Sequence, residues 1–319
     1  MPEWCISKRE LLDEALGPDT VANFAISEME AWLRYPKHNW ISNKLLVAQS
    51  QNFRCAPCEI WPEERDPERE VAELYPVVVK PMVNLFGMGV GACKVENSHS
   101  YLPHEIRSGS FWSEWLSGEF LSIDVLVRKG EPVWWCVFRG HQTEPWSGAF
   151  LYWESLYSQR LPPHLKKWMR RHLSDWTGCA NFETIGGLII EAHLRIGDLN
   201  HFRSKRLFTL LHQACSADIS LSDTAVKDLQ SIGHRLTPRI FLVPVFVLES
   251  EYPLVRKLSR RRVQQLCQDP SIAMVLCDNP PDQVGNPDGH VRLYNLTTTD
   301  LECGFEARDR LLEAGFASE

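Results

Sequence analysis

Apolar positions in the first third of the chain change from helical spacing to extended spacing. Residues 8–34 repeat apolar positions as amphipathic helices do, which predicts one or two helices that end at Pro36. A further helix is expected from about Ser42. The run VVVKP at 77–81 is β-branched and predicts a strand, and the glycine-containing segment 86–95 predicts a tight turn followed by a second strand.

The same alternation continues to the end of the chain. Apolar runs on both sides of positions 129–130 predict a β-hairpin, and a second hairpin is expected to turn at positions 186–187. Segment 162–176 begins with prolines and predicts a helix. From about residue 206 helical and extended patterns alternate. The sequence therefore predicts an α+β protein with antiparallel sheets and helices on their faces.

Composition narrows the class of protein. With 319 residues and 44% apolar content the chain can bury a large core, and its net charge of −7 argues against nucleic acid or an anionic membrane as the main partner. No apolar window is long enough to span a membrane, so a cytoplasmic location is expected. Ten cysteines lack a paired framework, and the lone CxxC at Cys55 and Cys58 fits packing better than zinc binding or redox chemistry.

Lys80 is the first charged residue that stands out within a predicted strand. It follows aliphatic residues, where a lysine costs free energy unless it meets an anion or reaches water at the strand end. The nearby glycines at 87–91 leave backbone N–H groups open to a phosphate, although a tight hairpin explains the same glycines. Together they indicate a candidate triphosphate clamp.

The second predicted hairpin carries two carboxylates. Glu183 and Glu191 are expected to share one face of the sheet only if an odd number of residues connects their strands, as in a three-residue loop at 186–188, whereas a two-residue Gly-Gly turn would leave them on opposite faces. His193 and Arg195 continue on the same side of the second strand. Facing carboxylates repel unless a proton or a cation lies between them, and Mg²⁺ suits carboxylate and phosphate oxygens. The alternative is an ordinary Arg195–Glu191 ion pair.

The order of these elements resembles that of ATP-grasp enzymes, in particular their carboxylate–amine ligase branch. The resemblance covers residues 40–205 and is carried most specifically by WLSGEF at 115–120 and IIEAHLRIGD at 189–198. It implies an α+β fold with two α+β subdomains that clamp ATP. The implied divisions are an amino-terminal helical segment (1–41), subdomain 1 (42–114), subdomain 2 (115–205) and a carboxy-terminal α+β region (206–319).

The resemblance also implies a role for each residue that matches the family pattern. The implied ATP contacts are Lys44 and Lys80 on the phosphates, Gly87, Gly89 and Gly91 in a flap, Glu114, Trp115 and Leu116 in the adenine hinge, and Glu119 on the ribose. The implied metal ligands are Glu183, Glu191 and His193, with Arg195 and His193 as catalytic residues. Candidate substrate contacts are Arg139, His141, Trp146 and Asp198.

The implied activity is ATP-dependent amide or peptide bond formation through an acyl phosphate. Its cofactors would be ATP and Mg²⁺, with Mn²⁺ as an alternative, and its substrates a small carboxylic acid and an amine or amino acid; a homodimer stays open. Other ATP-grasp chemistry, such as that of a carboxylase or a small-molecule kinase, and a silent nucleotide-binding scaffold are the alternatives. His193 stands where the family usually has asparagine, apolar Leu85, Phe86 and Met88 surround the flap glycines, and only about 40 residues precede Lys44.

Overall fold

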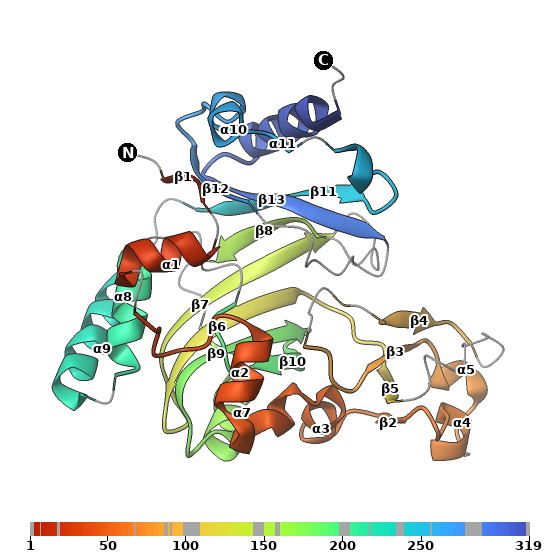
Figure 1. The fold of residues 1–319 in the computed structure, drawn as a ribbon. Coiled ribbons are helices and arrows are strands. Elements are labelled where there is room, and N and C mark those ends of the chain that lie inside the picture. The colour runs from red at the N-terminus through yellow and green to blue at the C-terminus, as the bar shows by residue number, and fades with distance from the viewer. Residues whose placement is uncertain are drawn as a thin grey trace.

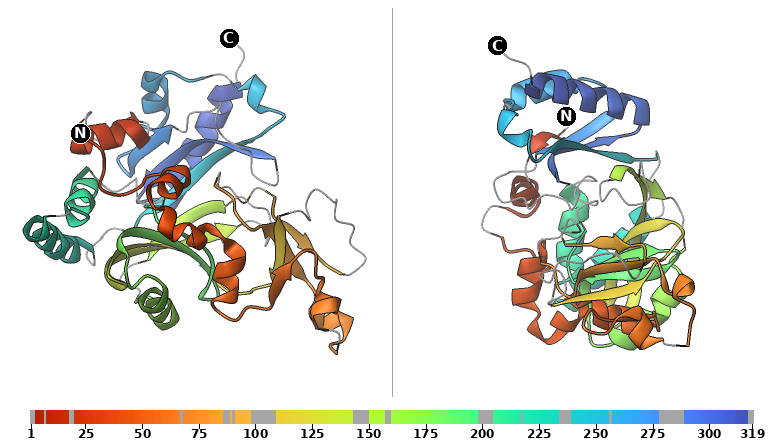
Figure 2. Two further views of the ribbon diagram at one scale, coloured as in Figure 1. Left: turned by 60° about the horizontal axis from the view of Figure 1, so that its bottom comes forward. Right: turned by 90° about the vertical axis from the view of Figure 1, so that its right-hand side faces the viewer.

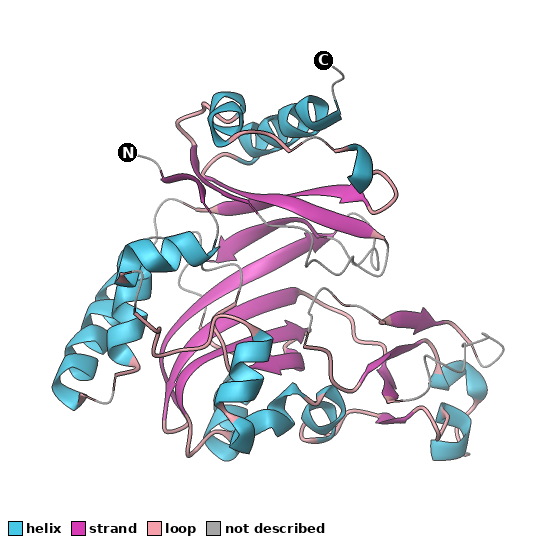
Figure 3. Ribbon diagram, viewed as in Figure 1, coloured by secondary structure: helices cyan, strands magenta, loops and turns pink. Residues whose placement is uncertain are grey.

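In the part of the chain that the structure describes, two sheets form the frame, one of nine strands and one of four (Figures 1 and 3). The computed structural model describes residues 3–6, 8–17, 20–66, 68–85, 89, 91–97, 109–142, 150–156, 160–197, 205–216, 218–233, 239–255, 257–277 and 289–316. No helix in this described part of the chain is long and apolar enough to cross a membrane.

The large sheet is antiparallel except at one edge, where its first two strands run parallel. Its strands in spatial order are β1 (Glu3–Ile6), β12 (Ile272–Cys277), β13 (His290–Thr298), β11 (Phe241–Leu248), β8 (Phe150–Leu156), β7 (Glu131–Gln142), β6 (Phe120–Arg128), β9 (Thr177–Ile185) and β10 (Leu188–His193). The pairing of β11 with β8 makes the carboxy-terminal strands continuous with the central hairpins.

The small sheet lies beside the β10 edge of the large one (Figures 1 and 2). Its strands in order are β2 (Cys55–Pro57), β5 (Ser110–Glu114), β3 (Val77–Pro81) and β4 (Cys93–Val95). Two short helices, α4 (Pro62–Arg65) and α5 (Val71–Leu74), flank it. Val77 and Val79 point into its core with Trp112, so that Lys80 lies on the other face, as the alternation of the strand predicts.

Helices cover both faces of the large sheet (Figure 2). Leu126 of β6 packs toward one face, with the cluster that includes α1 (Lys8–Leu16), α8 (Lys205–Ala214) and α9 (Ile219–Gly233). Ile123 and Val125 pack toward the opposite face, with α7 (Pro163–His172). The remaining helices are α2 (Glu28–Arg34), a 3₁₀ helix (Pro36–Ser42), α3 (Lys44–Gln49), a 3₁₀ turn (Tyr252–Leu254), α10 (Arg260–Leu266) and α11 (Leu301–Phe316).

Some element boundaries differ from the sequence expectations. The hairpin at 129–130 is confirmed, because both turn residues adopt positive φ, 50° at Lys129 and 78° at Gly130. The helix expected from Ser42 begins at Lys44 and ends at Gln49, because Asn52 adopts a φ of 62° and turns the chain back toward the helix. Strands β1, β2, β5 and β8 were not predicted.

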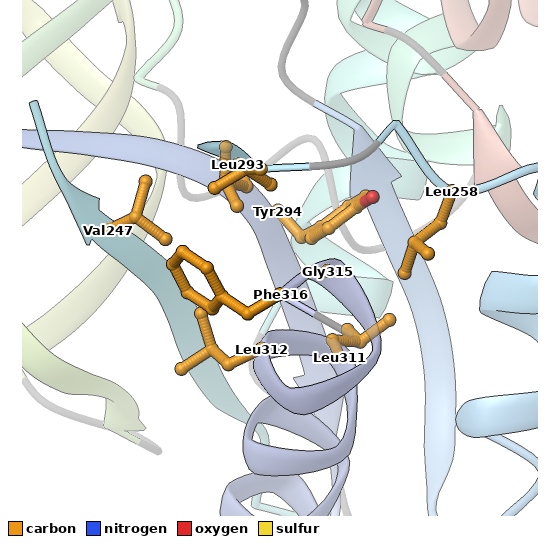
Figure 4. A pocket seen from close by; sticks show the side chains of 9 residues that line it. Val247, Leu258, Leu293, Tyr294, Leu311, Leu312, Gly315 and Phe316 are labelled. Carbon is orange, nitrogen blue, oxygen red and sulfur yellow. The ribbon is translucent and has the colours of Figure 1, made fainter. Parts of the chain in front are cut away.

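An apolar hollow lies between α11 and strands β11 and β13 (Figure 4). Its lining includes Val247, Leu293, Tyr294, Leu312 and Phe316. Among the described residues that line it, there is no carboxylate, lysine, arginine or histidine. The candidate chemistry therefore lies elsewhere, at the end of the large sheet that faces the small one.

Candidate functional site

The β9–β10 hairpin brings Glu183 and Glu191 directly opposite each other, as expected, but not through the expected loop. The turn has two residues rather than three. Gly186 and Gly187 take φ values of 56° and 88°, and positive φ at both positions is what a two-residue type I′ turn requires. The prediction of a three-residue loop was wrong. A bulge at Ile190 supplies the extra residue that shifts the register and brings the two carboxylates onto one face.

Glu183, Glu191 and His193 form one compact group. Each offers a ligand atom, and these atoms lie within 4.8 Å of one another; it is the one group of this kind found among the described residues. His193 Nε2 lies 3.1 Å from Oε2 of Glu191. The three predicted metal ligands are thus close enough to share one cation, with two oxygen ligands and one nitrogen ligand.

Two lysines from other elements converge on the same strand. Lys44, the first residue of α3, forms an ion pair with Glu191 and is itself buried. Lys80 of β3 donates a hydrogen bond of 3.2 Å to the carbonyl oxygen of Ile190, the bulge residue, and lies over the ring of Phe111. The small sheet and α3 therefore bring two cations to the carboxylates of the large sheet.

Local contacts fix where Lys44 points. The Asn43 side chain caps α3 by accepting from the N–H groups of Leu45 and Leu46. At the other end of the helix, the Gln51 amide makes two hydrogen bonds of 2.8 Å with the backbone of Ile189 and so extends the edge of β10. Sequence reasoning missed Gln51, because nothing near it in the chain indicates a partner 138 residues away.

Burial and charge shift the ionisation of this group in opposite directions. Burial raises the pKa of Glu183 to about 7, and the charge of Glu191 adds to that effect. Burial alone would raise the pKa of Glu191, but Lys44 and His193 outweigh it and hold that pKa well below its usual range. Burial lowers the pKa of Lys80 to about 8, assisted by the charge of Lys44. Glu191 is thus ionised at neutral pH, whereas Glu183 gains or loses its proton close to neutral pH.

Glu28 joins the group from the amino-terminal segment and was not anticipated. This residue lies in the first turn of α2 and is buried. Its Oε1 accepts a hydrogen bond of 2.9 Å from Arg195, and its Oε2 lies 3.5 Å from Nδ1 of His193. Glu191 is therefore paired with Lys44, and Arg195 is paired with Glu28. The sequence had offered an Arg195–Glu191 ion pair as the alternative, with neither of these partners.

The predicted hinge connects the two sheets, between the end of β5 and the start of β6. Glu114 accepts from the backbone N–H of Arg54, and Lys94 lies over the ring of Trp115 at 4.4 Å. Leu116 is partly buried and packs against the apolar cluster that includes Leu45 and Ala48 of α3. Close backbone contact continues at Gly118, where an added Cβ would lie 2.7 Å from Cα of Gly186. The hinge thus packs against the turn of the carboxylate hairpin.

The candidate substrate residues Arg139 and His141 lie on the other face of the large sheet. Arg139 is paired with Leu121 across β6 and β7, whereas Glu183 is paired with the next residue of β6, and successive side chains point to opposite faces. Arg139 contacts Glu119 at 2.6 Å, and His141 Nε2 lies 3.0 Å from Glu154. The structure therefore does not bring these residues together with the carboxylate pair.

The other sequence-predicted residues are placed as follows. Gly89 and Gly91 adopt positive φ, 67° and 78°, consistent with a turn, whereas Gly87, Trp146 and Asp198 lie outside the described residues. Cys55 and Cys58 are buried in separate apolar clusters, which agrees with the packing interpretation.

Structural comparison across most of the chain shows that it has the ATP-grasp fold, as the order of elements predicted. The chain is similar to an L-amino acid ligase from Bacillus licheniformis, with a TM-score of 0.55 and 13% identity over 85% of this chain and 70% of that one. No protein-family model matches the chain, and no curated protein is similar to it in sequence.

Two further similar structures hold nucleotide. One is carboxyaminoimidazole ribonucleotide synthase from Aspergillus clavatus complexed with ATP (TM-score 0.54, 14% identity, 86% of this chain and 74% of that one). The other is N5-carboxyaminoimidazole synthetase from Staphylococcus aureus complexed with ADP (TM-score 0.52, 11% identity, 92% of this chain and 78% of that one). Identities this low show a shared fold, and the activity of this chain must be argued from its own residues.

Proposed function

We propose that this protein is an ATP-dependent carboxylate–amine ligase that forms an amide or peptide bond through an acyl phosphate. The observation that carries the proposal is the opposed pair Glu183 and Glu191 with Lys44 and Lys80 directed at the same strand. This arrangement supports the proposal, because a triphosphate and its metal ion require cationic groups and oxygen ligands close together. The similar folds that hold ATP and ADP support the nucleotide assignment.

In this proposal the lysines exchange their present partners for phosphate oxygens. Lys44 leaves Glu191, and Lys80 leaves the carbonyl of Ile190, which frees Glu191 to bind a cation together with Glu183. Mg²⁺ held by these carboxylates would neutralise the phosphate charge during transfer. The hinge segment from Glu114 to Leu116 is proposed to meet the adenine, and Gly89 and Gly91 the phosphates. Glu119, the expected ribose contact, instead lies 2.6 Å from Arg139, on the face away from the carboxylate pair.

The proposed reaction has two balanced steps. A carboxylate oxygen of the acid attacks the γ-phosphorus of ATP, the bond to the β-phosphate oxygen breaks, and ADP leaves. The amine nitrogen then attacks the acyl carbon, inorganic phosphate leaves, and the nitrogen loses a proton. Arg195 is proposed to stabilise the charge that develops on the transferring group. Its guanidinium is buried and oriented by Glu28, so little reorganisation would be needed.

The proposed domain divisions follow the two sheets. Residues 42–114 contain the small sheet with Lys80, and residues 115–205 contain the hinge and the carboxylate hairpin. The amino-terminal segment 1–41 contributes Glu28, which accepts a hydrogen bond from Arg195. The carboxy-terminal region 206–319 continues the large sheet through β11.

Carboxylation of an amine is the second candidate function. It is favoured by the similarity to the two carboxyaminoimidazole-forming enzymes, whose TM-scores nearly equal that of the amino acid ligase. In such a reaction bicarbonate replaces the organic acid. The two candidates therefore differ in which carboxyl compound stimulates ADP formation.

Two measurements test the proposal. Nucleotide binding is followed by tryptophan fluorescence, because the chain has 12 tryptophans and Trp115 lies at the hinge. Substrates are then sought by measuring phosphate release with pairs of acids and amines, including bicarbonate. Glu191→Ala is expected to abolish release, whereas Glu306→Gln, an exposed change on α11, should behave as the wild type. ATP that fails to bind with any divalent cation would refute the proposal.

A further inference from the structure

His193 is held between two carboxylates in a way that a simple core histidine does not require. Its Nε2 lies 3.1 Å from Oε2 of Glu191, and its Nδ1 lies 3.5 Å from Oε2 of Glu28. The side chains of His193 and Glu28 are only 5% and 7% exposed. Within the described part of the structure, neither Nδ1 of His193 nor Oε2 of Glu28 has a hydrogen-bond partner. The two unpartnered atoms face each other.

This geometry matches the requirements of a metal-binding imidazole. A histidine that ligates a metal through one ring nitrogen commonly directs the other toward a carboxylate, which fixes the ring and increases the basicity of the ligating nitrogen. Here Nδ1 faces Glu28, and Nε2 lies among the ligand atoms of Glu183 and Glu191. Arg195 holds the other oxygen of Glu28 at 2.9 Å and so keeps the carboxylate in place.

We propose that His193 is a nitrogen ligand of the cation at this site, that Glu28 is its positioning residue, and that the site therefore prefers Mn²⁺ to Mg²⁺. The inference rests on the proposed function, because it concerns the same cation. Mg²⁺ is a hard ion that favours oxygen ligands, whereas Mn²⁺ accepts both carboxylate and imidazole ligands and still binds phosphate oxygens. Binding of the cation would take the place of the hydrogen bond between His193 and Glu191.

The charges of the cluster indicate that the cation arrives with the nucleotide. Three carboxylates, those of buried Glu28 and half-buried Glu183 and Glu191, are matched by three cationic side chains. These cations are Lys44, Lys80 and Arg195. Because the cluster has little net negative charge, a divalent ion alone gains little there until phosphates engage the lysines. The metal preference should therefore be measured with an ATP analogue present.

The test uses Mn²⁺ with a non-hydrolysable ATP analogue bound to the full-length chain. Electron spin echo envelope modulation of the bound Mn²⁺ is expected to show a directly coordinated nitrogen in the wild type and none in His193→Asn. Competition by Mg²⁺ gives the ratio of the two dissociation constants. The dissociation constant for Mg²⁺ divided by that for Mn²⁺ is expected to fall by at least about tenfold in His193→Asn. This is the magnitude associated with disrupting the surroundings of a metal ligand.

Glu28→Gln separates positioning from ligation. This variant keeps the shape of the side chain but removes its charge, so we expect Mn²⁺ affinity to fall by about 10- to 100-fold while the nitrogen signal remains. Glu306→Gln serves as the matched control for loss of one carboxylate at an exposed site. Circular dichroism and the melting temperature of each variant show whether it is folded.

Three outcomes are distinguishable. A nitrogen signal that disappears in His193→Asn, together with a reduced preference for Mn²⁺, supports the inference. Nucleotide that binds equally well with Mg²⁺ and Mn²⁺ in both wild type and His193→Asn, without a nitrogen signal, overturns the inference and leaves the proposed function intact. Nucleotide that binds with neither metal refutes the proposed function itself.

Discussion

Removal of Glu28 should reveal how much the amino-terminal segment stabilises the site. Glu28→Ala leaves the guanidinium of Arg195, which is 8% exposed, without its carboxylate, and it leaves Nδ1 of His193 facing an empty volume. The reverse change, Arg195→Met, leaves the Glu28 carboxylate buried without its cation. Each single change lowers the free energy of unfolding for the same reason. It leaves one charge without its partner at a position with little access to water.

The magnitude follows from the burial of the pair. Breaking a buried ion pair by removing one partner costs about 3–5 kcal/mol in the free energy of unfolding, whereas replacing both partners with apolar residues is often neutral. We therefore expect Glu28→Ala, Glu28→Leu and Arg195→Met each to lose about 3–5 kcal/mol, and Glu28→Leu combined with Arg195→Met to lose much less than the sum of those two single losses. For 319 residues, an unfolding entropy of about 2.1 cal/mol/K per residue converts this loss into a melting temperature lower by about 4–8 °C.

The assay is thermal and urea unfolding followed by tryptophan fluorescence. Asp175→Ala provides the control, because Asp175 also forms a short ion pair, 2.6 Å from Lys37, but at the surface. We expect that control to leave the unfolding free energy nearly unchanged, since exposed ion pairs contribute little. A Glu28→Ala variant as stable as Asp175→Ala, or a double variant whose loss equals the sum of the single losses, would refute the reasoning.

Two further predictions concern the lysine and the hinge. Burial and Lys44 lower the pKa of Lys80 to about 8, so the affinity for ATP should decrease as pH rises above 8, by up to about tenfold per unit, and Lys80→Arg should remove this dependence in a fluorescence titration. An unchanged pH profile in that variant would contradict the assignment. Gly118→Ala adds a Cβ 2.7 Å from Gly186 at a φ of 121° and should cost about 1–3 kcal/mol in urea unfolding. Gly109→Ala, at a φ of 71° but with open space around the Cβ, should cost less.

Strand periodicity explains why much of the fold was predictable. Alternation in β3 placed Lys80 opposite the buried face, and Lys129 and Gly130 between two apolar runs identified the hairpin of β6 and β7. Such signals are local, since each depends on residues within one strand or turn. The antiparallel sheets followed from them, whereas the pairing of Glu183 with Glu191 depends on a bulge at Ile190 that no local signal indicated.

Contacts between distant segments were not predictable in the same way. Glu28 meets Arg195 across 167 residues, and Gln51 meets Ile189 across 138. In their local sequence context, Glu28 and Gln51 do not stand out, because their partners are determined by how distant segments pack together. The face on which Arg139 lies was equally hidden, because it depends on the register of β7 with β6.

The bulge at Ile190 connects the register of the hairpin with the position of the lysine. Without the extra residue, the two-residue turn would place Ile190 opposite Glu183 and direct Glu191, together with His193, to the other face, away from Glu183. With it, Glu191 faces Glu183, and the carbonyl of Ile190 accepts the hydrogen bond from Lys80. One inserted residue thus brings the carboxylates together and also supplies the lysine with a neutral partner. Because a carbonyl holds a lysine less strongly than a carboxylate does, Lys80 should be easier than Lys44 to transfer to a phosphate.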